Sequence, residues 1–166
     1  MKVAEPDTVD TAAHPATAGS ALTILCADHR RVQQLMGLYA LLWADSGSQA
    51  DRAGLIARIG ACLHALGEVK QEIVYPLLAS RADAELLERA QRGQASIEQS
   101  LSRVAAEDGG TVAMDMQMSE LADLLHEQMA MEERLLFPLI EDIDSRDLAS
   151  RVALRRSVAL GLQGPD

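Results

Sequence analysis

Apolar residues recur every three or four positions through four long segments of this sequence, and that spacing constrains the fold more than any other feature. The four series cover residues 22–43, 59–77, 87–104 and 121–139. Such spacing matches one face of an α-helix, and no segment shows the alternation of a half-buried β-strand. Amphipathic helices joined by short loops pack as an antiparallel up-down-up-down four-helix bundle. The sequence therefore predicts an all-α fold of this kind.

The segments on either side of these helices divide the chain into three parts. Residues 1–19 are polar and rich in Pro, Thr and Ala, which predicts a flexible N-terminal tail. Residues 20–142 are expected to form the bundle, and residues 143–166 a short C-terminal helix and tail, with Ser145 as the helix N-cap. Because neither a secretory signal nor a long apolar stretch is present, we expect a cytoplasmic protein.

The charge of the chain restricts its partners. Among 166 residues, 25 acidic side chains oppose 15 Lys and Arg, which gives a formal net charge of −10. We therefore expect neither nucleic acid nor a membrane as partner, because both attract basic surfaces, and we leave a homodimer or another protein open. Two cysteines, Cys26 and Cys62, are too few for a disulfide scaffold, and their helical positions predict sulfur atoms too far apart for a disulfide.

The second and fourth predicted helices resemble each other. Residues 63–78 align with residues 125–140 at a constant offset, so that Lys70 corresponds to Glu132. Each segment contains an aromatic residue followed by proline near its end. This pattern is typical of two helical hairpins related by an approximate twofold axis. We expect each proline to kink its helix or to end the regular section.

Each apolar series also carries polar residues where apolar ones are expected, namely His29, Lys70, Gln94, Gln128 and Glu132. Because the middles of antiparallel helices lie at the same level, these residues predict a shared polar cluster near the bundle axis. A buried charge needs an opposite charge, so Lys70 and Glu132 are expected to pair, with the other three residues hydrogen-bonded to them. In the alternative, Lys70 extends to the end of the bundle and Glu132 is partly solvated.

The sequence resembles the hemerythrin-like, or HHE cation-binding, domain family across residues 20–142. The resemblance rests on the Asp28-His29 pair, the two acidic-aromatic-proline helix endings and the order of the four helices. Members of that family typically hold two irons inside the bundle, on His and carboxylate ligands from all four helices. The resemblance therefore implies the same bundle, and iron chemistry directed at oxygen or nitric oxide.

The resemblance also assigns the family's ligand positions to this chain, where they hold His29, Leu66, Lys70, Gln94, Gln128 and Glu132. Only His29 and Glu132 are retained as good metal ligands. Leu66 cannot ligate, Gln is a weak donor for iron, and Lys70 brings a positive charge into the site. Loss of the irons would leave Glu132 buried without a counter-charge, which an ammonium group at position 70 can replace in part.

From this exchange of residues we predict a hemerythrin-like protein that has lost the di-iron centre. It would be no enzyme and would need no cofactor, acting instead as a non-catalytic binding or regulatory module. Lys70, Gln94 and Gln128 would form a polar core network in place of the ligands. The alternative, which the resemblance itself implies, is an iron-dependent protein that binds oxygen or nitric oxide or handles iron.

A rival metal site would use His64, Glu68 and His126. His64 and Glu68 lie four residues apart, a spacing that places two ligands on one helix face. Their face is about 200° from the family ligand positions, and its neighbours look solvated. The ordinary interpretation is therefore a pair of exposed histidines, which a structure can decide.

Overall fold

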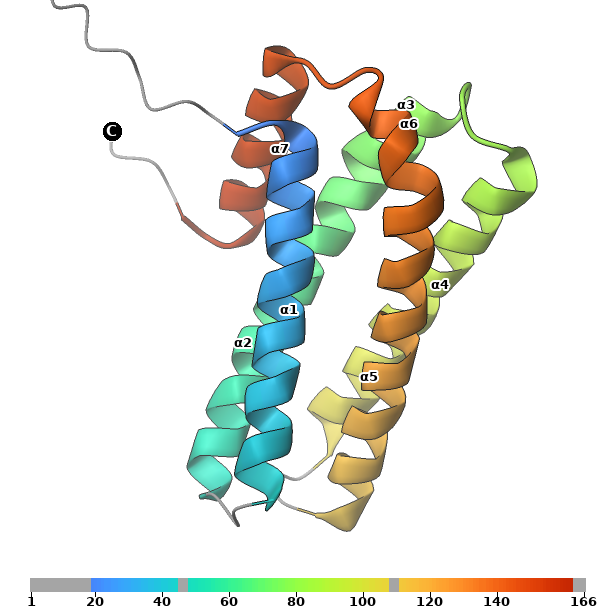
Figure 1. Cartoon of the computed structure of the whole chain (residues 1–166). Helices are drawn as coiled ribbons and strands as arrows, with labels where there is room; N and C mark the ends of the chain where they lie inside the picture. The colour runs from blue at the N-terminus through green and yellow to red at the C-terminus, as the bar shows by residue number, and fades with distance from the viewer. Residues whose placement is uncertain (1–18, 45–47, 108–110, 163–166) are drawn as a thin grey trace, which may run out of the picture.

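Four long helices run up and down along one axis in the computed structural model (Figure 1), which describes residues 19–44, 48–107 and 111–162. The second and fourth continue through a π-helical turn into a short last helix, and a fifth helix follows. In chain order the elements are α1 (Ala21–Ala44), α2 (Gln49–Val69), η1 (Lys70–Val74), α3 (Tyr75–Leu78), α4 (Ala84–Ala106), α5 (Val112–Met131), η2 (Glu132–Leu136), α6 (Phe137–Glu141) and α7 (Arg146–Ala159). The predicted all-α antiparallel bundle with a short C-terminal helix is confirmed.

The helices begin where side chains can accept hydrogen bonds from otherwise unpaired backbone N–H groups. Ser48, Asp83, Thr111 and Ser145 each accept from an N–H in the first turn of the helix that follows. The predicted N-cap at Ser145 is therefore confirmed. The first two N–H groups of α1 have a partner that is remote in the sequence, because both donate to the carboxylate of Asp144.

Pro76 and Pro138 each follow a π-helical turn by two residues. The N–H of Tyr75 bonds to the carbonyl of Lys70, and that of Phe137 bonds to the carbonyl of Glu132, so both bonds span five residues instead of four. A proline removes one N–H and crowds the carbonyl of the preceding turn, and a π-turn accommodates one additional residue there. The expectation that the prolines would mark an irregularity is confirmed, although the helix continues beyond each of them.

The apolar series meet in a single core between the two hairpins. Leu25, Ile59 and Leu121 are completely or almost completely buried. Helix α1 packs mainly against α2 and α4 against α5, while α7 lies across α1 and α2. No helix within the described residues is long and apolar enough to cross a membrane.

Ion pairs hold α7 in place. Arg155 binds Glu72 through two hydrogen bonds of 2.6 and 2.7 Å and also contacts Glu68 at 3.0 Å. Arg156 binds Asp28, at the residue before His29, with hydrogen bonds of 2.8 Å. The fifth helix is thereby attached near the start of α1 and the end of α2.

Parts of the tail and loops fall outside the described residues, whereas both cysteines lie within them. The flexible tail over residues 1–19 lies outside the described residues except for its last position. The loops at residues 45–47 and 108–110 lie outside them as well. Cys26 and Cys62 are free thiols, each half-buried, in agreement with the expectation that they form no disulfide.

Candidate functional site

An ion pair lies at the centre of the bundle, where the two π-helical turns begin. Lys70 is the first residue of η1 and Glu132 the first residue of η2. Lys70 Nζ lies 2.6 Å from Glu132 Oε2, and the two side chains are only 3% and 1% exposed. Lys70 therefore does not extend to solvent, and Glu132 is not solvated.

The other carboxylate oxygen of Glu132 accepts two hydrogen bonds. The Tyr75 hydroxyl donates to Oε1 at 2.9 Å, and Gln128 Nε2 donates to the same oxygen at 2.8 Å. The Gln128 amide also donates to the backbone carbonyl of Ala90 at 3.0 Å, which ties the site to α4. The carboxylate thus has an ammonium on one oxygen and two neutral donors on the other.

His29 connects this buried carboxylate to the surface. Its side chain is fully buried, with Nε2 3.3 Å from Glu132 Oε2 and Nδ1 2.8 Å from Glu133 Oε1. Glu133 is 46% exposed, so the chain of contacts from Lys70 reaches solvent there. The ring of Phe137 packs against the imidazole with 5.0 Å between centroids. His29 is therefore held between two carboxylates and an aromatic ring.

The electrostatics of the site keep Glu132 ionised. Burial raises the pKa of Glu132, but the charge of Lys70 and the contact with His29 outweigh burial and lower this pKa to about 2. Burial and the charge of Glu132 raise the pKa of Tyr75 far above its ordinary value, so its hydroxyl remains a donor. The site consequently contains a carboxylate whose charge is compensated from within the protein.

Gln94 is buried like the others but bonds elsewhere. Its Nε2 donates to Glu98 Oε1 at 3.2 Å, and that carboxylate also accepts from Gln71 Nε2 at 2.7 Å. A Cβ atom at Gly67 would lie 2.6 Å from the Gln94 amide, so the glycine admits this side chain between α2 and α4. The structure therefore brings His29, Lys70, Gln128 and Glu132 together and places Gln94 in a neighbouring polar group.

The rival set of ligands is dispersed. His64 is 66% exposed and lies 3.4 Å from Glu68 Oε1, while Glu68 also pairs with Arg155. His126 is exposed on α5. Over residues 19–44, 48–107 and 111–162, no group of three or more His, Cys, Asp or Glu side chains is arranged to hold a metal ion. His64, Glu68 and His126 thus form no shared site.

Three further residues complete the central site, and sequence reasoning missed them. Tyr75 follows Lys70 by five residues, which in a regular α-helix would rotate it about 140° away. Glu133 is adjacent to Glu132 and resembles a solvated charge. A methyl group at Gly93 would overlap the Gln128 amide oxygen. A glycine inside a helix lowers helix stability by about 1 kcal/mol relative to alanine. This unfavourable residue choice is the only feature of the sequence that points to Gly93.

The donor set of the site does not suit a pair of metal ions. Leu66, at one of the positions where the resemblance expects a ligand, is a buried hydrocarbon side chain. Lys70 Nζ stands directly against Glu132 Oε2, where it opposes any second cation. His29 and Glu132 remain as the two side chains of the ligand positions with good metal-binding atoms.

Comparison with known protein families places the four-helix bundle. The family model described as the hemerythrin HHE cation binding domain matches residues 20–140. No curated protein and no solved structure matches the chain. The matched range runs from the start of α1 to the last turn of α6 and ends before α7.

Proposed function

The chain belongs to the hemerythrin HHE cation-binding domain family, and on that premise we propose that it is an iron-free member acting as a non-catalytic binding or regulatory module. The observation that carries this proposal is the contact of 2.6 Å between Lys70 Nζ and Glu132 Oε2 in the core. The ammonium group takes the role of counter-charge that metal ions have in the family.

Charge balance supports the proposal. An isolated carboxylate in a protein interior costs several kcal/mol, so Glu132 could not persist beside so many apolar side chains without a cation. Lys70 supplies one positive charge, and Tyr75 and Gln128 donate to the second oxygen. The bundle is thereby complete without a metal, and the residues at the ligand positions do not fit a di-iron centre.

The iron-dependent alternative has one observation in its favour. His29 Nε2 and Glu132 Oε2 are buried 3.3 Å apart, and neither atom makes a hydrogen bond of regular geometry with a described residue, although Oε2 is in ionic contact with Lys70 Nζ. These are the two retained donor atoms of the family. Binding of iron between them would require the Lys70 ammonium group to leave its contact with the same carboxylate oxygen.

Measured iron content distinguishes the two functions. We would purify the full chain from iron-replete cells and measure iron by mass spectrometry together with the visible absorption spectrum. The proposal expects no stoichiometric iron in the wild-type protein. Two irons per chain, with a matching visible absorption, would overturn it in favour of the iron-dependent alternative.

Two variants at position 70 serve as a matched pair. Lys70→Glu removes the ammonium group and returns a carboxylate to the family ligand position, whereas Lys70→Gln removes the ammonium group alone. We expect K70E to retain more iron than K70Q when both are purified in the same way. Stoichiometric iron in wild type and K70Q as well as in K70E would contradict the role assigned to Lys70.

A further inference from the structure

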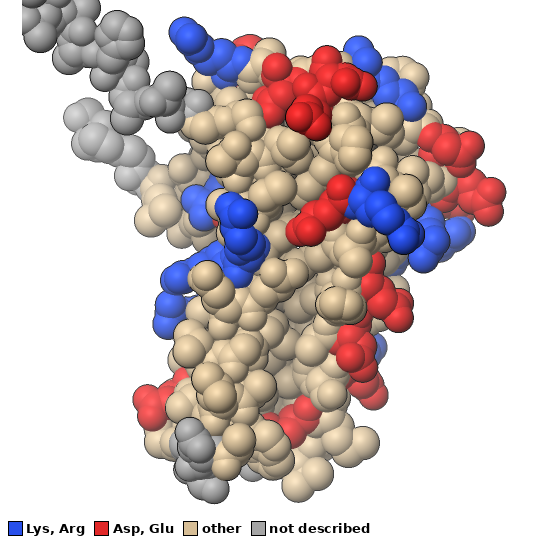
Figure 2. Space-filling view, in the orientation of Figure 1, with Lys and Arg blue, Asp and Glu red and all other residues tan. Residues whose placement is uncertain are grey.

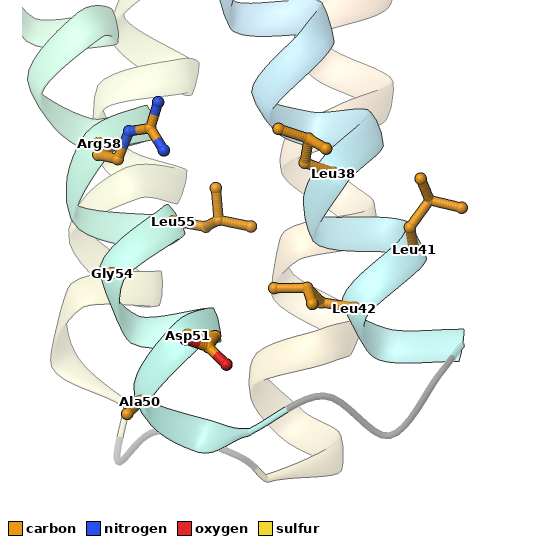
Figure 3. Close-up of a pocket in the computed structure, with 8 residues that line it drawn as sticks. All are labelled: Leu38, Leu41, Leu42, Ala50, Asp51, Gly54, Leu55 and Arg58. Carbon is orange, nitrogen blue, oxygen red and sulfur yellow. The ribbon is translucent and has the colours of Figure 1, made fainter.

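An apolar groove opens between α1 and α2 at the end of the hairpin that α7 does not cover (Figure 3). The groove has a volume of about 480 Å³, and Leu42 and Leu55 lie between the two helices there. Leu38 and Leu41 are 47% and 62% exposed beside it. Large exposed leucines next to an apolar groove are typical of an interaction surface.

The groove has one charge of each sign, at opposite ends. Asp51 lies near the start of α2 and Arg58 seven residues later, about 10 Å along the helix (Figure 3). Arg58 makes no ion pair with another described residue. A second copy of this helix in the antiparallel direction would place Asp51 opposite Arg58 of the partner subunit, and the reverse. The charges of this surface in one copy are therefore complementary to those of the same surface in a second copy.

The charge of the hairpin also permits contact between copies. Helices α1 and α2 carry four arginines and three acidic residues, whereas the whole chain has a net charge of −10. In Figure 2 uncharged side chains cover most of the lower half of the face over α1. The hairpin is thus close to neutral, and the repulsion between two copies of an acidic chain is weaker over it than the net charge of the chain suggests.

We propose that this groove binds a second copy of the chain in a twofold-symmetric dimer. In that arrangement Leu41 of each copy enters the groove of the other beside Gly54, where an added Cβ would meet nothing within 4 Å. Asp51 and Arg58 form two reciprocal ion pairs at its edges. A contact of this kind is self-complementary, as a twofold interface requires.

The extent of the groove sets the strength expected of the dimer. Helix α7 packs on the hairpin near the start of α1 and the end of α2, so the remaining face includes only part of each helix. Stable interfaces bury about 800 Å² per partner, and smaller ones belong to weak complexes. We therefore expect a dimer that dissociates on dilution, and this expectation does not depend on the metal content of the core.

Sedimentation velocity of the full chain over a range of concentrations tests the proposal. The sedimenting mass should rise from the chain mass of 17.9 kDa towards twice that value. Leu41→Glu should raise the dissociation constant at least about tenfold, because it places a charge inside the apolar contact. Leu154→Glu makes the same change at a leucine 68% exposed on α7, and should leave the constant unchanged.

Charge exchange tests the antiparallel arrangement itself. Arg58→Asp should weaken the dimer, because it faces Asp51 of the partner subunit with a like charge. Combining R58D with Asp51→Arg should restore the dimer by exchanging the signs of both pairs, and circular dichroism would verify that each variant is folded. A monomer at every concentration, equal effects of L41E and L154E, or a double variant no better than R58D would each overturn the proposal.

Discussion

The two halves of the bundle use the same backbone at the same place for opposite charges. In both, a long helix passes through a π-helical turn that begins at the central residue and is followed by an aromatic residue and a proline. The central residue is Lys70 in one half and Glu132 in the other. The two equivalent positions thus meet in the core, where their side chains form an ion pair.

The two halves share their backbone conformation but differ in the side chains that surround the central residue. Glu132 receives hydrogen bonds from Gln128 one turn earlier and from Tyr75 of the other half. Lys70 has Leu66 at the position equivalent to Gln128. The second half therefore keeps polar residues around its ligand position, while the first half supplies a cation and a hydrocarbon. The ammonium group of the first half is thus the counter-charge for the carboxylate of the second.

Removal of the cation should have the largest effect on this arrangement. Lys70→Met leaves Glu132 buried without a counter-charge, and we expect a loss of about 3–5 kcal/mol in the free energy of unfolding measured with urea. Arg92→Met is the matched control, because Arg92 pairs with Glu88 on the surface, where both are about two-thirds exposed. The control should change stability by less than about 0.5 kcal/mol. Similar losses in both variants would contradict the buried role of Lys70.

Acid should remove the contribution of Glu132 in a defined range. Its pKa in the folded protein is about 2, below the ordinary value of 4.5. The stabilisation is therefore fully present above pH 4.5 and decreases as the pH falls towards 2, because the unfolded chain takes up the proton first. We expect about 3 kcal/mol of pH-dependent stability in this range that Glu132→Gln lacks. Parallel stability profiles for wild type and E132Q would be evidence against an ionised Glu132.

Tyr75→Phe gives the first half the same aromatic residue that the second half has at the equivalent position, Phe137. The variant removes the hydrogen bond of 2.9 Å to Glu132 without a change in ring packing. Hydrogen bonds to charged groups contribute about 1.5–3 kcal/mol, and we expect a loss of stability in that range by urea unfolding. Tyr39→Phe removes a comparable bond to Asp115 and is the control. Only Y75F should also alter the acid dependence assigned to Glu132.

We expect the smallest change in stability from alanine substitutions at Gly93 and Gly67, two helix glycines that each leave room for a glutamine side chain. A methyl group at Gly93 would overlap the Gln128 amide, which Glu132 and Ala90 hold in place. Gly93→Ala should therefore destabilise the protein by about 1–2 kcal/mol through overpacking. Gly67→Ala meets the amide of Gln94, which can move with the exposed Glu98, and should be nearly neutral in thermal unfolding. A greater loss for G67A than for G93A would reverse our ranking of the two polar groups.

Most of the fold follows from the sequence, because apolar spacing, caps and loop residues are local signals. The polar residues on the apolar series also indicated that Lys70 and Glu132 would meet, and in the structure their charged atoms are in contact. The role assigned to the network stays a prediction that metal analysis and the variants above can test. The expectation that Gln94 would bond to the pair fails, because its donor reaches Glu98 one turn further along its own helix.

The π-helical turns explain what the sequence did not reveal. One inserted residue leaves no trace in a helical pattern apart from the proline that follows, yet it rotates every later side chain. Tyr75 therefore reaches the centre although it is five residues from Lys70. Glu133 could not be distinguished from a surface charge, because its neighbour Glu132 already occupies the buried position. Side-chain partners that depend on the rotation of a helix require the structure.

A double-mutant cycle between Lys70 and Glu132 tests most directly whether the ammonium group is the counter-charge of the buried carboxylate. The free energies of unfolding of wild type, K70M, E132Q and the double variant give the coupling between the two side chains. We predict a coupling of about 2–4 kcal/mol, with the double variant more stable than the sum of the single losses implies. Additive losses, with a coupling below about 0.5 kcal/mol, would contradict the account.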